Sequence, residues 1–122
     1  MTTILIVDDN PDICELFTTF LTLAGFSTLS APGGEECLEL LKKNHPDLIL
    51  LDIMMEPMDG WQTLTLIKNH PESKDIPVMM VTGKAIMDSE QQKYSGKFEI
   101  YLMKPVTPTQ LKETIEDILK SQ

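Results

Sequence analysis

The segment Leu48-Ile-Leu-Leu-Asp52 decides the fold, because it joins four consecutive apolar residues to a single acid. So short an apolar run without alternation is typical of a strand that is covered on both faces, as in a parallel sheet. Residues 4–7, 78–81 and 100–103 form three further runs of this kind. Residues 26–30 alternate instead, which indicates an edge strand with one wetter face. The sequence therefore predicts five strands.

Segments with helical periodicity separate these runs. The first begins with Pro11 and stops at Gly25, and both residues are typical of those positions. Capping boxes are predicted to begin at Asp59 and Thr107, each followed three residues later by a glutamine. Helices are therefore expected at about 11–24, 34–44, 59–67, 84–94 and 107–119. The fourth is polar and weakly amphipathic, so we expect it to have low stability and to move.

The alternation of strands and helices predicts the fold class. Parallel strands joined by short connections need right-handed helical crossovers. The expected fold is therefore α/β, a doubly wound five-stranded parallel sheet between layers of helices. A chain of 122 residues has the size of one ordinary domain, and we expect residues 1–122 to form a single domain.

Composition excludes several kinds of partner. Against 19 acidic residues the chain has 10 basic ones, all lysine, which gives a formal net charge of -9 and a pI near 4.5. Direct binding to nucleic acid needs a basic patch, and an anionic membrane surface needs positive charge, so neither partner is expected. The chain has no signal-peptide pattern, no run of membrane-spanning length and only two cysteines. We therefore expect a cytoplasmic, reducing location.

Polar side chains follow each of the four long apolar runs. Asp8 and Asp9 follow the first, Asp52 ends the second, Thr82 follows the third and Lys104 follows the fourth. The carboxyl ends of parallel strands meet at one edge of the sheet, which is where ligands bind, so these residues should converge. Three clustered carboxylates repel one another, and a hard divalent cation such as Mg2+ relieves that repulsion.

This group also has the parts for phosphoryl transfer. A carboxylate beside a metal ion can act as a nucleophile and form an acyl phosphate. Asp52 is the natural nucleophile, because it stands alone at the end of a central strand. Lys104 can neutralise phosphoryl oxygens, and the Thr82 hydroxyl can donate a hydrogen bond to one of them.

These residues lie within longer motifs, and with them the sequence resembles the response-regulator receiver domain of two-component signalling. The separations are family-like, at 43, 30 and 22 residues from Asp9 through Asp52 and Thr82 to Lys104. The resemblance covers essentially all 122 residues. The matching motifs are Val-Asp8-Asp9-Asn-Pro, Leu-Leu-Asp52-Ile-Met-Met, Met58-Asp59-Gly60, Val-Thr82-Gly83-Lys84 and Tyr101-Leu-Met-Lys104-Pro105.

The resemblance implies a fold and a function. The fold is a flavodoxin-like (βα)5 three-layer sandwich with strand order 2-1-3-4-5. Asp52 would take a phosphoryl group from a sensor histidine kinase or a histidine phosphotransfer protein. The domain would catalyse its own phosphorylation and dephosphorylation rather than act as an enzyme on other substrates. It would signal to a downstream target protein or output domain.

The resemblance also implies roles for individual residues. Mg2+, or Mn2+ in its place, would be held by Asp8, Asp9, Asp52 and the backbone carbonyl of Met54. Lys104 would pair with Asp52 and then with the phosphoryl group, and the Lys104-Pro105 peptide would be cis. Thr82 and Tyr101 would switch the face formed by the fourth helix, fifth strand and fifth helix.

Two local features bear on this interpretation. Glu56 separates Met55 from Pro57, where receivers commonly have Met-Pro, so the conformation of this loop is open. The side chains of Met54 and Lys84 would flank the path of a water molecule to the acyl phosphate. Apolar Met54 cannot orient that water, which predicts slow self-dephosphorylation.

Two alternative functions stay open. A small Mg2+-dependent phosphatase could also use an aspartyl phosphate. Such enzymes usually have a second Asp two residues after the nucleophile and a substrate cap, whereas this chain has adjacent Asp8 and Asp9 and no cap. A flavodoxin-like redox role is disfavoured, because the first loop lacks a Ser/Thr/Gly phosphate cradle.

Overall fold

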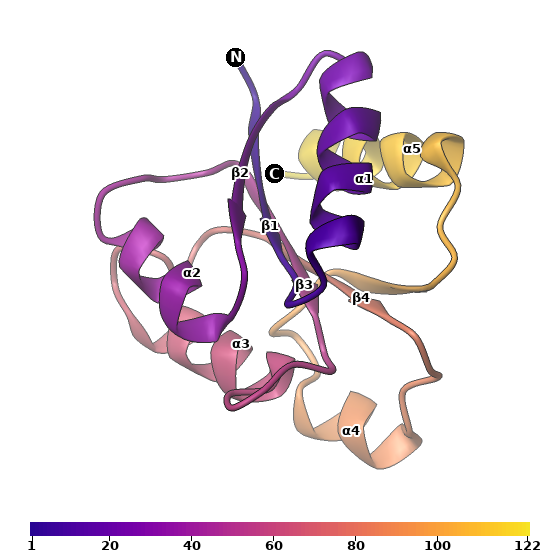
Figure 1. Ribbon diagram of the computed structural model, residues 1–122. Coiled ribbons are helices and arrows are strands. Elements are labelled where there is room, and N and C mark those ends of the chain that lie inside the picture. Colours follow the sequence, from indigo (N-terminus) through magenta and orange to yellow (C-terminus); the bar gives the residue numbers. More distant parts are fainter.

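The computed structural model describes residues 1–122, in which five strands alternate with five helices (Figure 1). All neighbouring strands are parallel, and their order in the sheet is β2-β1-β3-β4-β5. The predicted fold class and strand order are thus confirmed. The elements are β1 (Thr3–Val7), α1 (Pro11–Leu23), β2 (Ser27–Ala31), α2 (Gly34–Leu41), β3 (Leu48–Asp52), α3 (Gly60–Asn69), β4 (Val78–Thr82), α4 (Asp88–Lys93), β5 (Ile100–Met103) and α5 (Pro108–Lys120).

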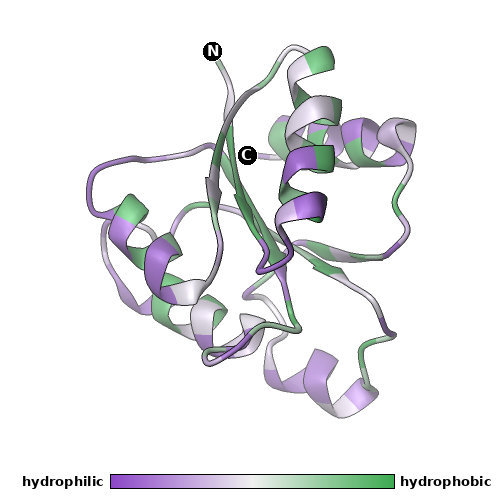
Figure 2. Ribbon diagram, in the orientation of Figure 1, coloured by the Kyte–Doolittle hydropathy of each residue, from purple (hydrophilic) through white to green (hydrophobic).

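Alternate residues of the central strands enter two hydrophobic cores, one on each face of the sheet. Leu5, Ile49 and Met80 belong to the core that α2 and α3 cover. Ile4 and Leu48 belong to the core beneath α1 and α5. Figure 2 shows mostly apolar central strands between helices that mix apolar and polar residues. Each fully buried Leu or Ile stabilises the fold by about 2 kcal/mol, so the register of the central strands is strongly determined.

Local sequence signals set the starts of the long helices. The side chain of Asn10 accepts a hydrogen bond from the backbone N–H of Asp12 at the start of α1. Asp59 forms the predicted capping box of α3, and the Thr107 hydroxyl accepts from the backbone at the start of α5. These bonds satisfy N–H groups that have no partner within the helix. None of the five helices has the length and apolar content that crossing a membrane requires.

Two helices are shorter than the sequence predicts. The second ends at Leu41 rather than near residue 44, and both the backbone N–H and the side chain of Asn44 bond to the Leu40 carbonyl oxygen as the chain turns away. The fourth begins at Asp88 rather than near residue 84, and none of its residues is buried. A polar segment with no apolar stripe gains little from packing, which explains why so short a helix forms.

The prediction that residues 100–103 form a strand covered on both faces is wrong. Ile100 and Met103 of β5 are 43% and 46% exposed, whereas every residue of β3 and β4 is buried. The strand order explains the difference, because β5 has a neighbour on one side only. Both β2 and β5 are therefore edge strands.

Candidate functional site

Three carboxylates meet at the carboxyl ends of β1 and β3. Oxygen atoms of Asp8, Asp9 and Asp52 all lie within 4.8 Å of one another. Asp8 and Asp52 are only 3% and 5% exposed, while Asp9 is exposed. The sheet register thus brings the predicted acidic group together, with one member open to solvent.

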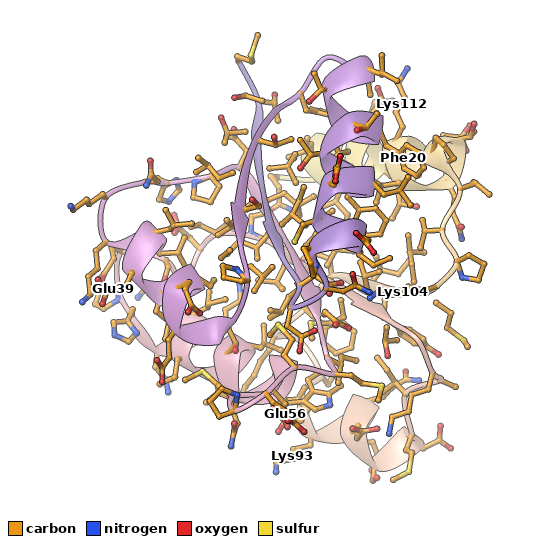
Figure 3. The ribbon with its side chains drawn as sticks, viewed as in Figure 1. Phe20, Glu39, Glu56, Lys93, Lys104 and Lys112 are labelled. Atoms are coloured by element: carbon orange, nitrogen blue, oxygen red, sulfur yellow. The ribbon has the colours of Figure 1, made fainter.

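One lysine serves the two buried carboxylates. Lys104 Nζ lies 2.8 Å from Asp8 Oδ2 and 3.7 Å from Asp52 Oδ2, so its closer partner is Asp8 rather than the expected Asp52. Its backbone N–H donates to the Thr82 carbonyl oxygen at 2.7 Å, which fixes Lys104 just beyond the sheet. In Figure 3 Lys104 lies beside the first turn of α1. Because one ammonium faces two carboxylates, the group keeps an excess of negative charge.

The electrostatics of Asp52 reflect this shortage of positive charge. Burial raises the pKa of Asp52 to about 6, and the negative charge of Asp8 contributes to the rise. Lys104 and a hydrogen bond from the Met54 backbone N–H, 3.3 Å from Asp52 Oδ1, oppose that rise in pKa in part. Because the site disfavours the ionised form of Asp52, a further cation would be bound favourably there. Its all-oxygen donor set matches the preference of Mg2+.

Thr82 ends β4, the strand next to β3. It is fully buried, and its Oγ1 accepts a hydrogen bond from the Lys84 backbone N–H at 3.2 Å. The register pairs Asp52 with Val81, which sets Thr82 at the same edge of the sheet as the acidic group. A hydroxyl that accepts from the backbone keeps its own proton for donation to another oxygen.

Tyr101 lies apart from the acidic group. It is half-buried on β5 opposite Met80 and packs against the core on the α3 side of the sheet. The structure therefore places it beside the face that the sequence assigned to switching, one strand beyond Thr82.

The loop between β3 and α3 is held by backbone contacts. Gly60 N–H donates to the Ile53 carbonyl oxygen at 2.8 Å, and a Cβ on Gly60 would overlap the Asp52 carbonyl oxygen. Met55 is buried, whereas Met54 is 56% exposed beside the acidic group. The peptides Glu56-Pro57 and Lys104-Pro105 are both cis. The loop conformation that the sequence left open is thus a turn folded back onto the end of β3.

No sequence pattern predicted one pair of residues beside the site. The Trp61 side chain is buried, and its Nε1–H donates to Glu90 Oε2 at 2.8 Å. Both residues line a cavity of about 440 Å³ that also includes Asp9 and Lys84. The two partners lie 29 residues apart, on α3 and α4, so no local pattern connects them.

Comparison with known proteins identifies the family of this chain. A family model described as the response regulator receiver domain matches residues 4–116. The polar-differentiation response regulator DivK of Brucella ovis is 34% identical over 116 residues, which cover 95% of this chain and 94% of that protein.

Solved structures show the same likeness. The N-terminal domain of a response regulator receiver protein from Methanoculleus marisnigri has 50% identity and a TM-score of 0.83, covering 98% of this chain and 97% of that one. Chemotaxis protein CheY4 of Vibrio cholerae has 26% identity and a TM-score of 0.90, with 97% and 98% covered. TrrA of Thermotoga maritima, solved in complex with Mg2+-BeF, has 29% identity and a TM-score of 0.85, with 97% and 99% covered. This chain therefore belongs to the response regulator receiver domain family and is a receiver domain of a two-component response regulator.

Proposed function

We propose that residues 1–122 form one receiver domain in which Asp52 is the phosphoacceptor of a phosphorelay. The observation that carries the proposal is the cluster of three carboxylates within 4.8 Å that shares one lysine. Asp52 is the central member, at the end of β3 between β1 and β4. In this protein family such a group accepts a phosphoryl group and later loses it by hydrolysis.

The transfer is a displacement at phosphorus. An Asp52 carboxylate oxygen forms the new O–P bond, and the N–P bond of a phosphohistidine on the partner breaks, leaving the electron pair on the imidazole nitrogen. Hydrolysis later releases inorganic phosphate and restores the carboxylate. Lys104, held 3.7 Å from Asp52, is placed to pair with phosphoryl oxygens, and the Thr82 hydroxyl can donate to one.

The same residues fit a divalent cation. Asp8, Asp9, Asp52 and the backbone carbonyl of Met54 would hold Mg2+, and Mn2+ could replace it. When bound, the cation supplies positive charge that neutralises phosphoryl oxygens. Two of the three carboxylates are buried with a single lysine, which is the charge deficit that such an ion balances. The Mg2+-BeF complex of the relative TrrA supports this assignment.

The partners follow from the same chemistry. The phosphoryl donor would be a sensor histidine kinase or a histidine phosphotransfer protein. The signal would pass through Thr82 and Tyr101 to the face of α4, β5 and α5, which would dock on a downstream target protein or output domain. Neither nucleic acid nor a membrane is proposed as a direct partner.

The test is incubation with Mg2+ and acetyl phosphate, followed by intact mass measurement. Wild type should gain one phosphoryl group, and Asp52→Asn should gain none. Asp12→Asn is the matched control, because this exposed carboxylate lies near the site but outside the cluster, and it should be labelled like wild type. Labelling of Asp52→Asn would overturn the assignment. Repeated turnover of a generic phosphomonoester would favour the alternative, a small Mg2+-dependent phosphatase.

A further inference from the structure

The start of α3 is tied to the end of β3. Gly60, the first residue of α3, donates its N–H to Ile53 and packs directly on the Asp52 carbonyl. Trp61 is the next residue and is only 6% exposed. The position of the Trp61 indole is therefore fixed by the same backbone that carries the phosphoacceptor.

The neighbouring helix α4 contacts that indole. No residue of α4 is buried. Trp61 Nε1–H donates to Glu90 Oε2 of α4 at 2.8 Å. The Trp61 ring stacks on Tyr94, the residue that follows α4, with centroids 4.3 Å apart and planes 5° from parallel. This bond and stack, together called the α4 clasp, join α4 to the body of the protein.

Glu90 connects the clasp to the loop that leaves β4. Its second carboxylate oxygen, Oε1, accepts from the Met87 backbone N–H at 3.0 Å. Met87 ends the segment 83–87, which begins immediately after Thr82. One carboxylate therefore binds a fixed indole with one oxygen and the end of the Thr82 loop with the other.

We propose that Trp61 and Glu90 are positioning residues that hold α4 in its unphosphorylated place and oppose the response to phosphorylation. This inference rests on the proposed phosphoacceptor role of Asp52. If Thr82 moves toward a phosphoryl oxygen, the segment 83–87 moves with it. Met87 is the N-cap of α4 and is bonded to Glu90 within that helix, so α4 moves with the segment and Glu90 loses its bond to Trp61. Phosphorylation and the clasp thus compete, and by linkage a weakened clasp favours the phosphorylated form by the same factor.

Two substitutions weaken the clasp in different ways. Trp61→Phe removes the indole N–H and keeps an aromatic ring against Tyr94. Glu90→Gln leaves one acceptor oxygen for two donors, so one of the two bonds is lost. Glu90 is half-exposed, so its variant remains available if Trp61→Phe does not fold. Gln91→Gly is the matched control, because it lowers the helix propensity of exposed α4 and leaves the clasp intact.

The measured quantity is the affinity for beryllium fluoride with Mg2+, a stand-in for the phosphoryl group, followed on backbone amide NMR signals. Both clasp variants should bind about fivefold more tightly than wild type. The double variant should gain no more than the better single one, because either change alone already prevents Glu90 from bonding Trp61 and Met87 at the same time. Gln91→Gly should bind like wild type. In wild type the single indole N–H signal should shift on binding.

The outcomes separate the two proposals. If wild type does not bind beryllium fluoride, or Asp52→Asn binds it equally well, the phosphoacceptor role fails and the clasp inference fails with it. If wild type binds and both clasp variants bind with unchanged affinity, only the clasp inference fails. An increase in Gln91→Gly equal to that in Trp61→Phe would also overturn it, because helix stability alone would then set the response.

Discussion

The helices α3 and α4 follow the adjacent inner strands β3 and β4, yet they are attached to the protein in different ways. Helix α3 has ten residues, five of them buried, and a capping box at Asp59. Helix α4 has six residues and none buried, and in Figure 2 it is largely hydrophilic. The phosphoacceptor precedes the firmly packed helix, and Thr82 precedes the loosely held one. We call β3 with its loop and α3 the firm side, and β4 with its loop and α4 the loose side. The firm side can keep the geometry of the reacting group while the loose side moves in response to phosphorylation.

The largest expected effect tests the firm side at Gly60. In Gly60→Ala the new Cβ would overlap the Asp52 carbonyl oxygen and lie 2.6 Å from Cα of Ile53, so backbone must shift. We expect the free energy of unfolding to fall by about 3 kcal/mol, measured by urea denaturation.

Gly83→Ala is the matched change on the loose side. Apart from Gly83 and its two chain neighbours, no residue has an atom within 4 Å of the place where the alanine Cβ would stand, so stability should change by less than about 0.5 kcal/mol. Equal losses at Gly60 and Gly83 would show that the two loops are equally constrained.

The second effect concerns the buried charge at the end of β3. An unfolded Asp has a pKa of 3.8, whereas that of Asp52 in the folded metal-free protein is raised to about 6. Between these values the folded state binds more protons than the unfolded state, so the contribution of Asp52 to stability falls as pH rises from about 4 to 6. Asp52→Asn removes this loss and should stabilise the metal-free protein by about 2 kcal/mol at pH 7.5, with little gain at pH 4.

Urea denaturation in EDTA at both pH values measures this effect. Asp88→Asn, an exposed carboxylate on α4, is the control and should leave stability unchanged at either pH. A stabilisation of Asp52→Asn that is the same at pH 4 and pH 7.5 would contradict the charge explanation.

A third, smaller effect compares the first turns of the two helices. Asp59 accepts a hydrogen bond from Gln62 N–H at 2.9 Å, so Asp59→Ala should cost about 1 kcal/mol of stability. Asp88→Ala in the first turn of α4 should cost less than about 0.5 kcal/mol, because little stability depends on that helix. Thermal unfolding of both variants gives the comparison. A larger loss at Asp88 would reverse the assignment of firm and loose sides.

The smallest effect concerns the lifetime of the phosphoryl group. Met54 lies on the firm loop, where a polar side chain could hold a water molecule in a fixed place near Asp52. Met54→Asn or Met54→Glu should therefore speed phosphate loss about threefold, which is less than 1 kcal/mol in the barrier. Met54→Leu keeps the site apolar and should decay like wild type. Decay is followed by intact mass after removal of acetyl phosphate, and unchanged rates in the polar variants would refute the idea.

Features that depend on residues close together in the chain could be predicted from the sequence. The apolar runs that end in Asp8, Asp52 and Thr82 predicted the positions of the strands. They also predicted the edge of the sheet where the polar side chains meet, because parallel strands in register end at the same edge. The caps at Asp59 and Thr107 were likewise readable from residues three apart.

Other features depend on distances between elements and could not be predicted. Lys104 lies 2.8 Å from Asp8 and 3.7 Å from Asp52, and both carboxylates are far from it in the sequence. Trp61 and Glu90 meet only when α3 and α4 are placed. The exposure of Ile100 follows from an edge position that the hydropathy of the run does not reveal.

The strand order β2-β1-β3-β4-β5 also bears on how the chain is completed during synthesis on the ribosome. Once β3 has joined β1, each later strand pairs with the one translated just before it, so the sheet grows at one edge in the order of translation. Lys104 follows the last strand and is the final residue of the site to emerge. Until β5 docks, Asp8 and Asp52 lack their ammonium partner, so the closing of the sheet and the neutralisation of its acidic edge are one event.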